Sequence, residues 1–254
     1  MAHAGWSRTF FLAWLGTDWH SCLSGARLRK RQSRGLAPLR YHTPEACALM
    51  PSPFPAYTTK ELSKKTWPDF VHLFSQGSGW DFCACMHFHR PCSLPKDQWL
   101  RTRAERGVRN RRQKRALVEQ GCAHGVLVYN GGEPVGWCQY GPREELPRID
   151  NKRVYQGLAP KGPQKLWRIT CFAVLKPYRK RGVATAALHA ALESIRRQGG
   201  GLVEAYPITR WLSRAFSNES THGTESMFKK AGFQPVAPFG STRYSSHVLM
   251  RKTV

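Results

Sequence analysis

The sequence predicts a mixed α and β fold, and three observations carry that prediction. An apolar segment at Trp167–Val174 has the β-branched and aromatic composition of a buried strand. A segment from Val183 onward repeats apolar residues with the 3.6-residue period of a helix. Upstream, two apolar segments flank Asn130-Gly131-Gly132, as in a hairpin. With 41% hydrophobic residues, the chain of 254 residues can bury one full core.

The hairpin is expected from residues 125–129 and 134–140. The intervening Asn-Gly-Gly favours a turn with positive φ, which glycine adopts without steric cost. The strand at Trp167–Val174 should end at Lys176-Pro177, because proline donates no ladder hydrogen bond and restrains the residue before it. A basic loop, residues 179–184, follows at once.

This basic loop leads into the helix, and the junction predicts an anion site. The first N–H groups of a helix lack intrahelical acceptors and lie at the positive end of its dipole. Gly182 and Ala184 are small enough to let a phosphate approach the backbone, and Arg179 and Arg181 add positive charge. A helix that starts among solvated arginines is the alternative interpretation.

Three further elements follow the helix. Residues 201–207 are typical of a short strand, and residues 223–230 of a short helix that Gly232 would end as a C-cap. Val248, Leu249 and Met250 are expected in a last strand.

The pattern Arg179-x-x-Gly182-x-Ala184 after a strand resembles the acyl-CoA-binding signature of the GCN5-related N-acetyltransferase (GNAT) family. The order of the flanking elements matches that family over the second half of the chain, and a looser match extends back to about Pro55. The resemblance implies an α+β (α/β) GNAT fold, with a mixed central sheet of about six to seven strands flanked by helices on both faces.

The resemblance also implies an activity and a cofactor. The expected reaction moves an acetyl group from acetyl-CoA directly to an amine, either a small molecule or a peptide. The backbone of Phe172, Ala173 and Val174 would bind pantetheine and polarise the thioester. The pyrophosphate would lie on Arg179, Lys180, Arg181, Gly182, Val183 and Ala184.

Proton transfer is harder to assign. Family members often use a glutamate as base on a central strand, and Glu204 is the candidate carboxylate here, expected where two strands splay apart; an ordinary ion pair with an arginine is its alternative role. His222 is a second candidate. Many members use a helix tyrosine as acid, but this chain has Phe228 there, so Tyr206 or Tyr244 would have to replace it.

The charge of the chain raises the question of partners. Forty lysines and arginines against 16 acidic residues give a formal net charge of +24. A dense basic run, residues 101–115, is expected on a helix with Trp99, Leu100 and Leu117 inward. Without interleaved aromatic residues, a solvated face is favoured over a nucleic-acid site. A catalytically weak module that binds an acidic partner, such as nucleic acid or the ribosome, is the alternative function. The charge argues mildly against basic acceptors.

Residues 1–49 differ in composition from residues 50–254, which should form the acetyltransferase domain. They are rich in arginine and serine and have few acids. A start site assigned too early, with Met50 as the initiator, and an organellar transit peptide both fit this extension, which we expect to be disordered. The first implies a cytoplasmic protein, the second an organellar one. No apolar run approaches the ~20 residues of a membrane span.

Eight cysteines without a convincing secretory signal indicate reduced thiols. If residues 81–89 formed a strand, then Cys83, Cys85, His87 and His89 would share one face. Such residues lie about 7 Å apart along a strand, so four cannot converge on one ion without a bend. We therefore expect no metal, and favour buried packing of the cysteines over a zinc site or a reactive thiol.

Overall fold

A computed structural model describes residues 57–76, 80–92, 102–211, 221–241 and 245–254 of the protein. All of them lie within one compact unit, Pro51–Val254. The prediction for residues 1–49 falls outside the described residues, as do Trp99 and Leu100.

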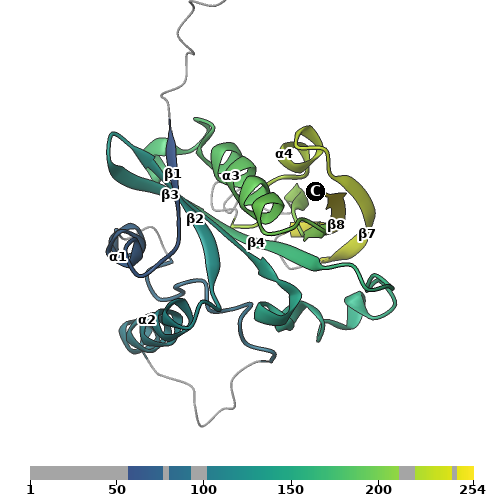
Figure 1. Cartoon of the computed structure of the whole chain (residues 1–254), viewed down its shortest axis with the longest axis horizontal. Helices are drawn as coiled ribbons and strands as arrows, with labels where there is room; N and C mark the ends of the chain where they lie inside the picture. The colour runs from purple at the N-terminus through teal and green to yellow at the C-terminus, as the bar shows by residue number, and fades with distance from the viewer. Residues whose placement is uncertain (1–56, 77–79, 93–101, 212–220, 242–244) are drawn as a thin grey trace, which may run out of the picture. The chain divides into compact units, whose positions relative to one another are not determined.

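An eight-stranded sheet forms the centre of this unit (Figure 1). The strands are β1 (Thr58–Glu61), β2 (His124–Asn130), β3 (Glu133–Pro142), β4 (Leu166–Val174), β5 (Leu202–Ala205), β6 (Ile208–Trp211), β7 (Gln234–Ser241) and β8 (Ser245–Thr253). Their order is β1-β2-β3-β4-β5-β8-β6, with β7 paired to β8. Only the β4–β5 pair is parallel among the described strand pairings, so the sheet is mixed, as expected.

The hairpin prediction is confirmed. Strands β2 and β3 pair antiparallel from His124↔Tyr140 to Asn130↔Glu133, and both turn glycines have positive φ, 58° at Gly131 and 93° at Gly132. Bulky side chains fill the centre of the hairpin, where Trp137 is fully buried. The hairpin lies between β1 and β4 in the sheet.

Helices cover both faces of the sheet (Figure 1). On one side lie α3 (Val183–Arg197) and α4 (Glu225–Lys230), and on the other α1 (Trp67–Ser75) and α2 (Arg103–Glu119). The predicted apolar stripe of α3 is buried, from Val183 to Ile195. Helix α1 turns Phe70, Leu73 and Phe74 inward, which is the i, i+3, i+4 spacing of one helix face.

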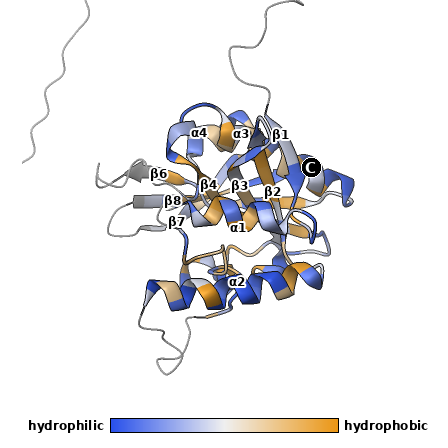
Figure 2. Ribbon diagram, turned by 90° about the vertical axis from the view of Figure 1, so that its left-hand side faces the viewer, coloured by the Kyte–Doolittle hydropathy of each residue, from blue (hydrophilic) through white to orange (hydrophobic). Residues whose placement is uncertain are grey.

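Helix α2 carries the predicted basic run and differs from its neighbours. It begins with a capping box, in which Thr102 and Glu105 satisfy each other's backbone N–H groups. Most of its residues are hydrophilic (Figure 2), and even its buried residues include Asn110 and Lys114. The described residues contain no helix with the length and hydrophobicity that a membrane span requires.

Candidate functional site

The loop between β4 and α3 has a defined backbone conformation. A short 3₁₀ helix, η6 (Lys176–Tyr178), follows the strand. The Arg179 side chain then turns back, and its Nε donates to the Val174 carbonyl oxygen at 3.2 Å. Lys180 and Gly182 have φ of 60° and 85°. The Tyr57 hydroxyl donates to the Arg181 carbonyl oxygen at 3.1 Å, which ties the loop to the segment before β1.

Gly182 is the N-cap of α3, and two properties of this position suit an anion. No side chain caps the helix start, so its first N–H groups keep their capacity to bind a ligand. A Cβ at Gly182 would find no atom within 4 Å, so space is open beside the backbone. The positive end of the helix dipole therefore faces an accessible surface.

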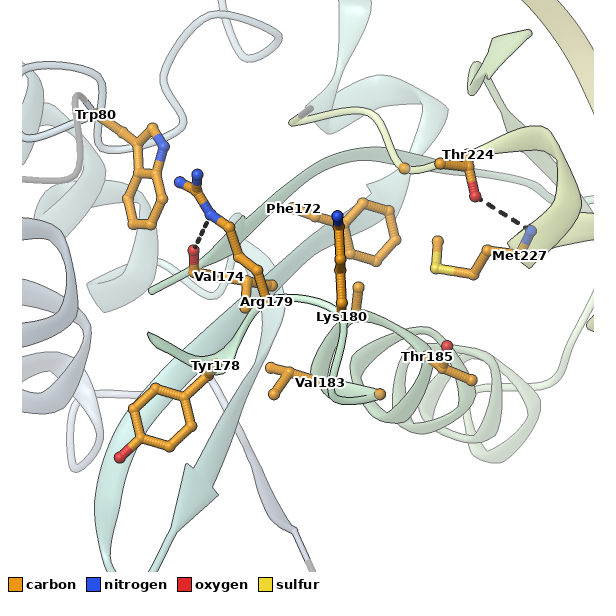
Figure 3. Close-up of a pocket in the computed structure, with 13 residues that line it drawn as sticks. Trp80, Phe172, Val174, Tyr178, Arg179, Lys180, Val183, Thr185, Thr224 and Met227 are labelled. Atoms are coloured by element: carbon orange, nitrogen blue, oxygen red, sulfur yellow. Dashed lines mark hydrogen bonds between the residues drawn. The ribbon is translucent and has the colours of Figure 1, made fainter. Parts of the chain in front are cut away.

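That surface belongs to a cavity of about 370 Å³ between β4, α3 and α4 (Figure 3). Its walls combine the apolar end of β4 with the basic loop and the first residues of α4. The lining residues are Trp80, Phe172, Val174, Tyr178, Arg179, Lys180, Gly182, Val183, Ala184, Thr185, Gly223, Thr224 and Met227. We call it the donor cavity. Apolar and cationic surfaces thus meet in one space, as a ligand with a flexible apolar arm and phosphates would require.

Seven of the nine predicted cofactor-binding residues line the donor cavity. Ala173 instead lines a second cavity on the opposite side of β4, and Arg181 is outside both linings. The sequence alone does not indicate the other lining residues, which are Trp80, Tyr178, Thr185, Gly223, Thr224 and Met227. Tyr178 and Thr185 flank the recognised motif, whereas the others reach the cavity only through the fold.

The parallel strands β4 and β5 separate beside this cavity. They pair only from Leu166↔Leu202 to Ile169↔Ala205, so beyond Ile169 β4 is paired with β3 but no longer with β5. The splay expected from the family resemblance is therefore present. However, the Phe172 N–H donates to the Thr221 carbonyl oxygen at 2.6 Å, so this edge group already has an acceptor.

A bulge in β4 decides which side chains face each cavity. Gln139 pairs with Cys171 and Tyr140 with Ile169, which leaves Thr170 as an extra residue. Thr170 Oγ1 bonds Gln139 Oε1 at 3.0 Å, while Cys171 Sγ lies 3.4 Å from Cys85 Sγ on the same side. Phe172 consequently turns to the α4 side.

Phe228 occupies the core rather than the cavity. It is fully buried, with its ring 6.0 Å from that of Phe172 and 5.0 Å from that of Phe233. Met227 lines the donor cavity in its place. The position that carries a tyrosine in many relatives therefore supplies packing here and no proton.

Glu204 lies inside the paired part of β4 and β5, opposite Arg168, rather than at the splay predicted from the sequence. Its carboxylate is completely buried. Oε1 accepts from Arg251 Nη2 at 2.7 Å, and Oε2 from the hydroxyls of Tyr155 at 2.7 Å and Tyr206 at 2.8 Å. Glu204 therefore has the alternative role that the sequence allowed, an ion pair with an arginine. It lines neither cavity.

Tyr206 shares this network and is buried as well. Burial, the Glu204 charge and the bond to Glu204 raise the pKa of Tyr206 well above its usual range. The catalytic roles of Glu204 and Tyr206 stay predictions. Tyr244 lies outside the described residues.

His222 is placed at the second cavity, not in solvent. Burial, followed by the charges of His247 and Lys152, lowers its pKa to about 3. The imidazole is therefore neutral at pH 7 and can accept a hydrogen bond.

Residues 81–89 form turns. The strand that would have placed Cys83, Cys85, His87 and His89 on one face does not form, so that prediction is wrong. Ala84 and Cys85 have positive φ, 45° and 47°, which no strand contains. The Trp137 indole N–H donates to Cys85 Sγ at 3.2 Å, and Lys114 Nζ bonds His89 Nε2 at 2.7 Å. Among the described residues, no group of three or more metal-binding side chains is assembled.

Comparison with known proteins identifies the family. Residues 86–209 match the model of the acetyltransferase (GNAT) family. The chain carries a GNAT-family domain. This assignment agrees with the mixed sheet, the signature loop and the splay, and it indicates a general acetyltransferase function. A search of curated proteins gave no match.

Solved structures with similar backbones have low sequence identity. An acetyltransferase of the GNAT family from Desulfovibrio desulfuricans is 14% identical, covers 78% of this chain and 99% of its own, and has a TM-score of 0.45. Arabidopsis thaliana NAA60, solved in complex with acetyl-CoA, is 13% identical with the same coverages and a TM-score of 0.42. The ribosomal-protein-S5-alanine acetyltransferase from Vibrio fischeri is 13% identical, covers 78% and 92%, and has a TM-score of 0.45.

Proposed function

We propose that this protein is an N-acetyltransferase that moves the acetyl group of acetyl-CoA directly to an amine. One observation carries the proposal: the uncapped N-terminus of α3 and two basic side chains open into the donor cavity, whose other wall is apolar. Coenzyme A has the same two-part character, with charged phosphates and a long uncharged arm.

The phosphates would be held by the first N–H groups of α3, together with Arg179 and Lys180. Charged hydrogen bonds of this kind are about twice as strong as neutral ones. Arg179 is already oriented by its bond to Val174, so little side-chain freedom is lost on binding. The pantetheine arm would lie along Phe172, Val174 and Met227, which give an apolar path from the loop toward the splay.

Acetyl-CoA supplies an activated acyl group, and this chain must position the amine and handle two protons. The Phe172 N–H points to the edge where a thioester carbonyl would be polarised, but it must first exchange its bond to Thr221. With Phe228 unable to donate a proton, the hydroxyls in the described lining belong to Tyr178, Thr185 and Thr224. A proton for the leaving thiolate would come from one of these or from water.

The test uses two glycines with matched backbones. Gly182 and Gly121 have φ of 85° and 73°, and a Cβ at either would meet nothing within 4 Å. Gly182→Glu puts a carboxylate where the phosphates would bind, whereas Gly121→Glu adds the same charge and strain at the end of α2. Each should cost about 1–2 kcal/mol of stability. Only Gly182→Glu should weaken acetyl-CoA binding, by about tenfold or more.

Binding is measured by titration calorimetry with acetyl-CoA, and turnover by thiol release against a panel of amines. Equal acetyl-CoA affinity in the two variants would contradict the location of the donor site. Tight binding without turnover on any amine would favour the alternative function, a module that holds an acidic partner.

A further inference from the structure

A second cavity of about 380 Å³ adjoins the donor cavity and shares Trp80 and Phe172 with it. It lies on the face of β4 covered by residues 80–89. Its lining residues are Phe74, Trp80, Phe82, Cys83, Cys85, His87, Phe88, Gln139, Cys171, Phe172, Ala173, Thr221 and His222. We call it the acceptor cavity. Five phenylalanine and tryptophan rings in this lining give it the shape and polarity of a site for a flat apolar group.

Among the polar residues of the acceptor cavity, Cys83 has a raised pKa and His87 and His222 have lowered ones, so these three are uncharged at neutral pH. Burial opposes ionisation of the Cys85 thiol, but its hydrogen bond with Cys171 and the charge of Lys114 lower its pKa. The described lining of the cavity contains no aspartate or glutamate. Gln139 is fully buried and is fixed by bonds to the Cys85 carbonyl oxygen at 2.9 Å and to His89 Nε2 at 3.0 Å. Burial raises the pKa of the Cys83 thiol to about 11, so this sulfur is protonated. Gln139 and the Cys83 thiol can therefore orient a ligand without attracting a cation.

The surroundings of the acceptor cavity disfavour positive charge. Burial and then His247, Lys152 and His87 lower the pKa of His222, whose ring lies 5.1 Å from that of His247. Desolvation and then Arg148, Lys152 and Arg90 lower the pKa of His87. The same desolvation and the same cations act on any ammonium group that enters, and no carboxylate in the described lining compensates. An alkylamine, which is a cation at pH 7, would therefore bind poorly.

We propose that the acceptor cavity binds a weakly basic aromatic amine, with the amino group attached directly to the ring. Such an amine is neutral at pH 7, and its ring suits the aromatic walls. The inference rests on the proposed function, since it names the acceptor of that reaction. The amine nitrogen forms a bond to the acetyl carbon, the carbon–sulfur bond breaks, and the nitrogen's proton passes to the departing thiolate, directly or by way of water.

The experiment compares aniline with benzylamine, which have the same ring but differ in basicity. Titration of each into the full chain with coenzyme A present reports binding without turnover, and thiol release with acetyl-CoA reports the reaction. At pH 7 we expect aniline to have at least about a tenfold advantage in affinity and in kcat/KM. The benzylamine kcat/KM should rise about tenfold per pH unit above neutrality, whereas that of aniline stays flat.

Cys83 allows the charge of the acceptor cavity to be changed on its own. Cys83→Asp adds a carboxylate to the lining and should shift the aniline-to-benzylamine ratio about tenfold toward benzylamine. Cys83→Ser changes the side chain without adding charge, and Cys122→Asp adds the charge at an exposed cysteine outside the lining. Both controls should keep the wild-type ratio.

Equal affinity for the two amines in the wild type, or an unchanged ratio in Cys83→Asp, would overturn the inference. If acetyl-CoA binds and only alkylamines or peptides are acetylated, the inference fails while the proposed function stands. If acetyl-CoA does not bind at all, the proposed function itself fails.

Discussion

Replacing Glu204 with glutamine should severely destabilise the domain. The carboxylate is fully buried and accepts hydrogen bonds from Arg251 and two tyrosine hydroxyls, while Arg168 Nε lies 3.9 Å from Oε2. Glutamine has one acceptor oxygen, and its NH₂ group would face donors. Arg168 would keep Asp150, at 2.7 Å, but Arg251 would lose its carboxylate. Breaking a buried ion pair by changing one partner costs about 3–5 kcal/mol.

Thermal unfolding measures this loss directly. For a domain of this size, about 3–5 kcal/mol corresponds to a fall in Tm of roughly 6–20 °C. Glu193→Gln is the control, because Glu193 pairs with Arg196 at the exposed surface of α3, where ion pairs contribute about 0–1 kcal/mol. A loss below about 1 kcal/mol in Glu204→Gln would refute the structural role of this carboxylate. Thiol release per folded molecule, measured below Tm, then tests the catalytic role separately: it should be retained if Glu204 only holds the sheet together.

Two further changes test packing and protonation. Gly125→Ala would place a Cβ 2.0 Å from the buried Trp137 ring, so urea unfolding should show a loss of about 1–3 kcal/mol or more; wild-type stability would contradict the packing of the hairpin. His222 has its pKa lowered from 6.5 to about 3, so the folded protein binds fewer protons than the unfolded chain between these values. The free energy of unfolding should fall as pH drops below about 6.5, by up to about 1.4 kcal/mol per pH unit from this residue, and His222→Gln should reduce that slope. An identical slope in the variant would show that His222 titrates normally.

The elements that the sequence predicts well are those with local signals. The period of α3, the glycine turn after β2 and the proline after β4 all act within a few residues, and each element lies where expected. Gly182 could be recognised for the same reason, since a helix start that binds an anion needs a small residue at its N-cap.

The remaining features depend on contacts between distant residues. The position of Glu204 follows from its pairing with Arg168 and from Arg251, which is 47 residues away, and no local pattern reports such a partner. The acceptor cavity joins residues from five separate segments of the chain. The side-chain alternation of a strand was also a wrong guide for residues 81–89. Their apolar composition is typical of a strand, but positive φ at Ala84 and Cys85 produces turns.

The extra residue in β4 has a consequence for how such an enzyme can diversify. Because Thr170 shifts the alternation, Val174 contributes to the donor cavity, Cys171 and Ala173 to the acceptor cavity, and Phe172 to both. In the proposed function, one strand therefore lies between the site of the cosubstrate and the site of the acceptor. On that proposal, substitutions at Cys171 or Ala173 change the lining of the acceptor cavity without altering Val174 or the basic loop, residues 179–184. A lineage could thus change its substrate by small steps while its donor chemistry stays constant.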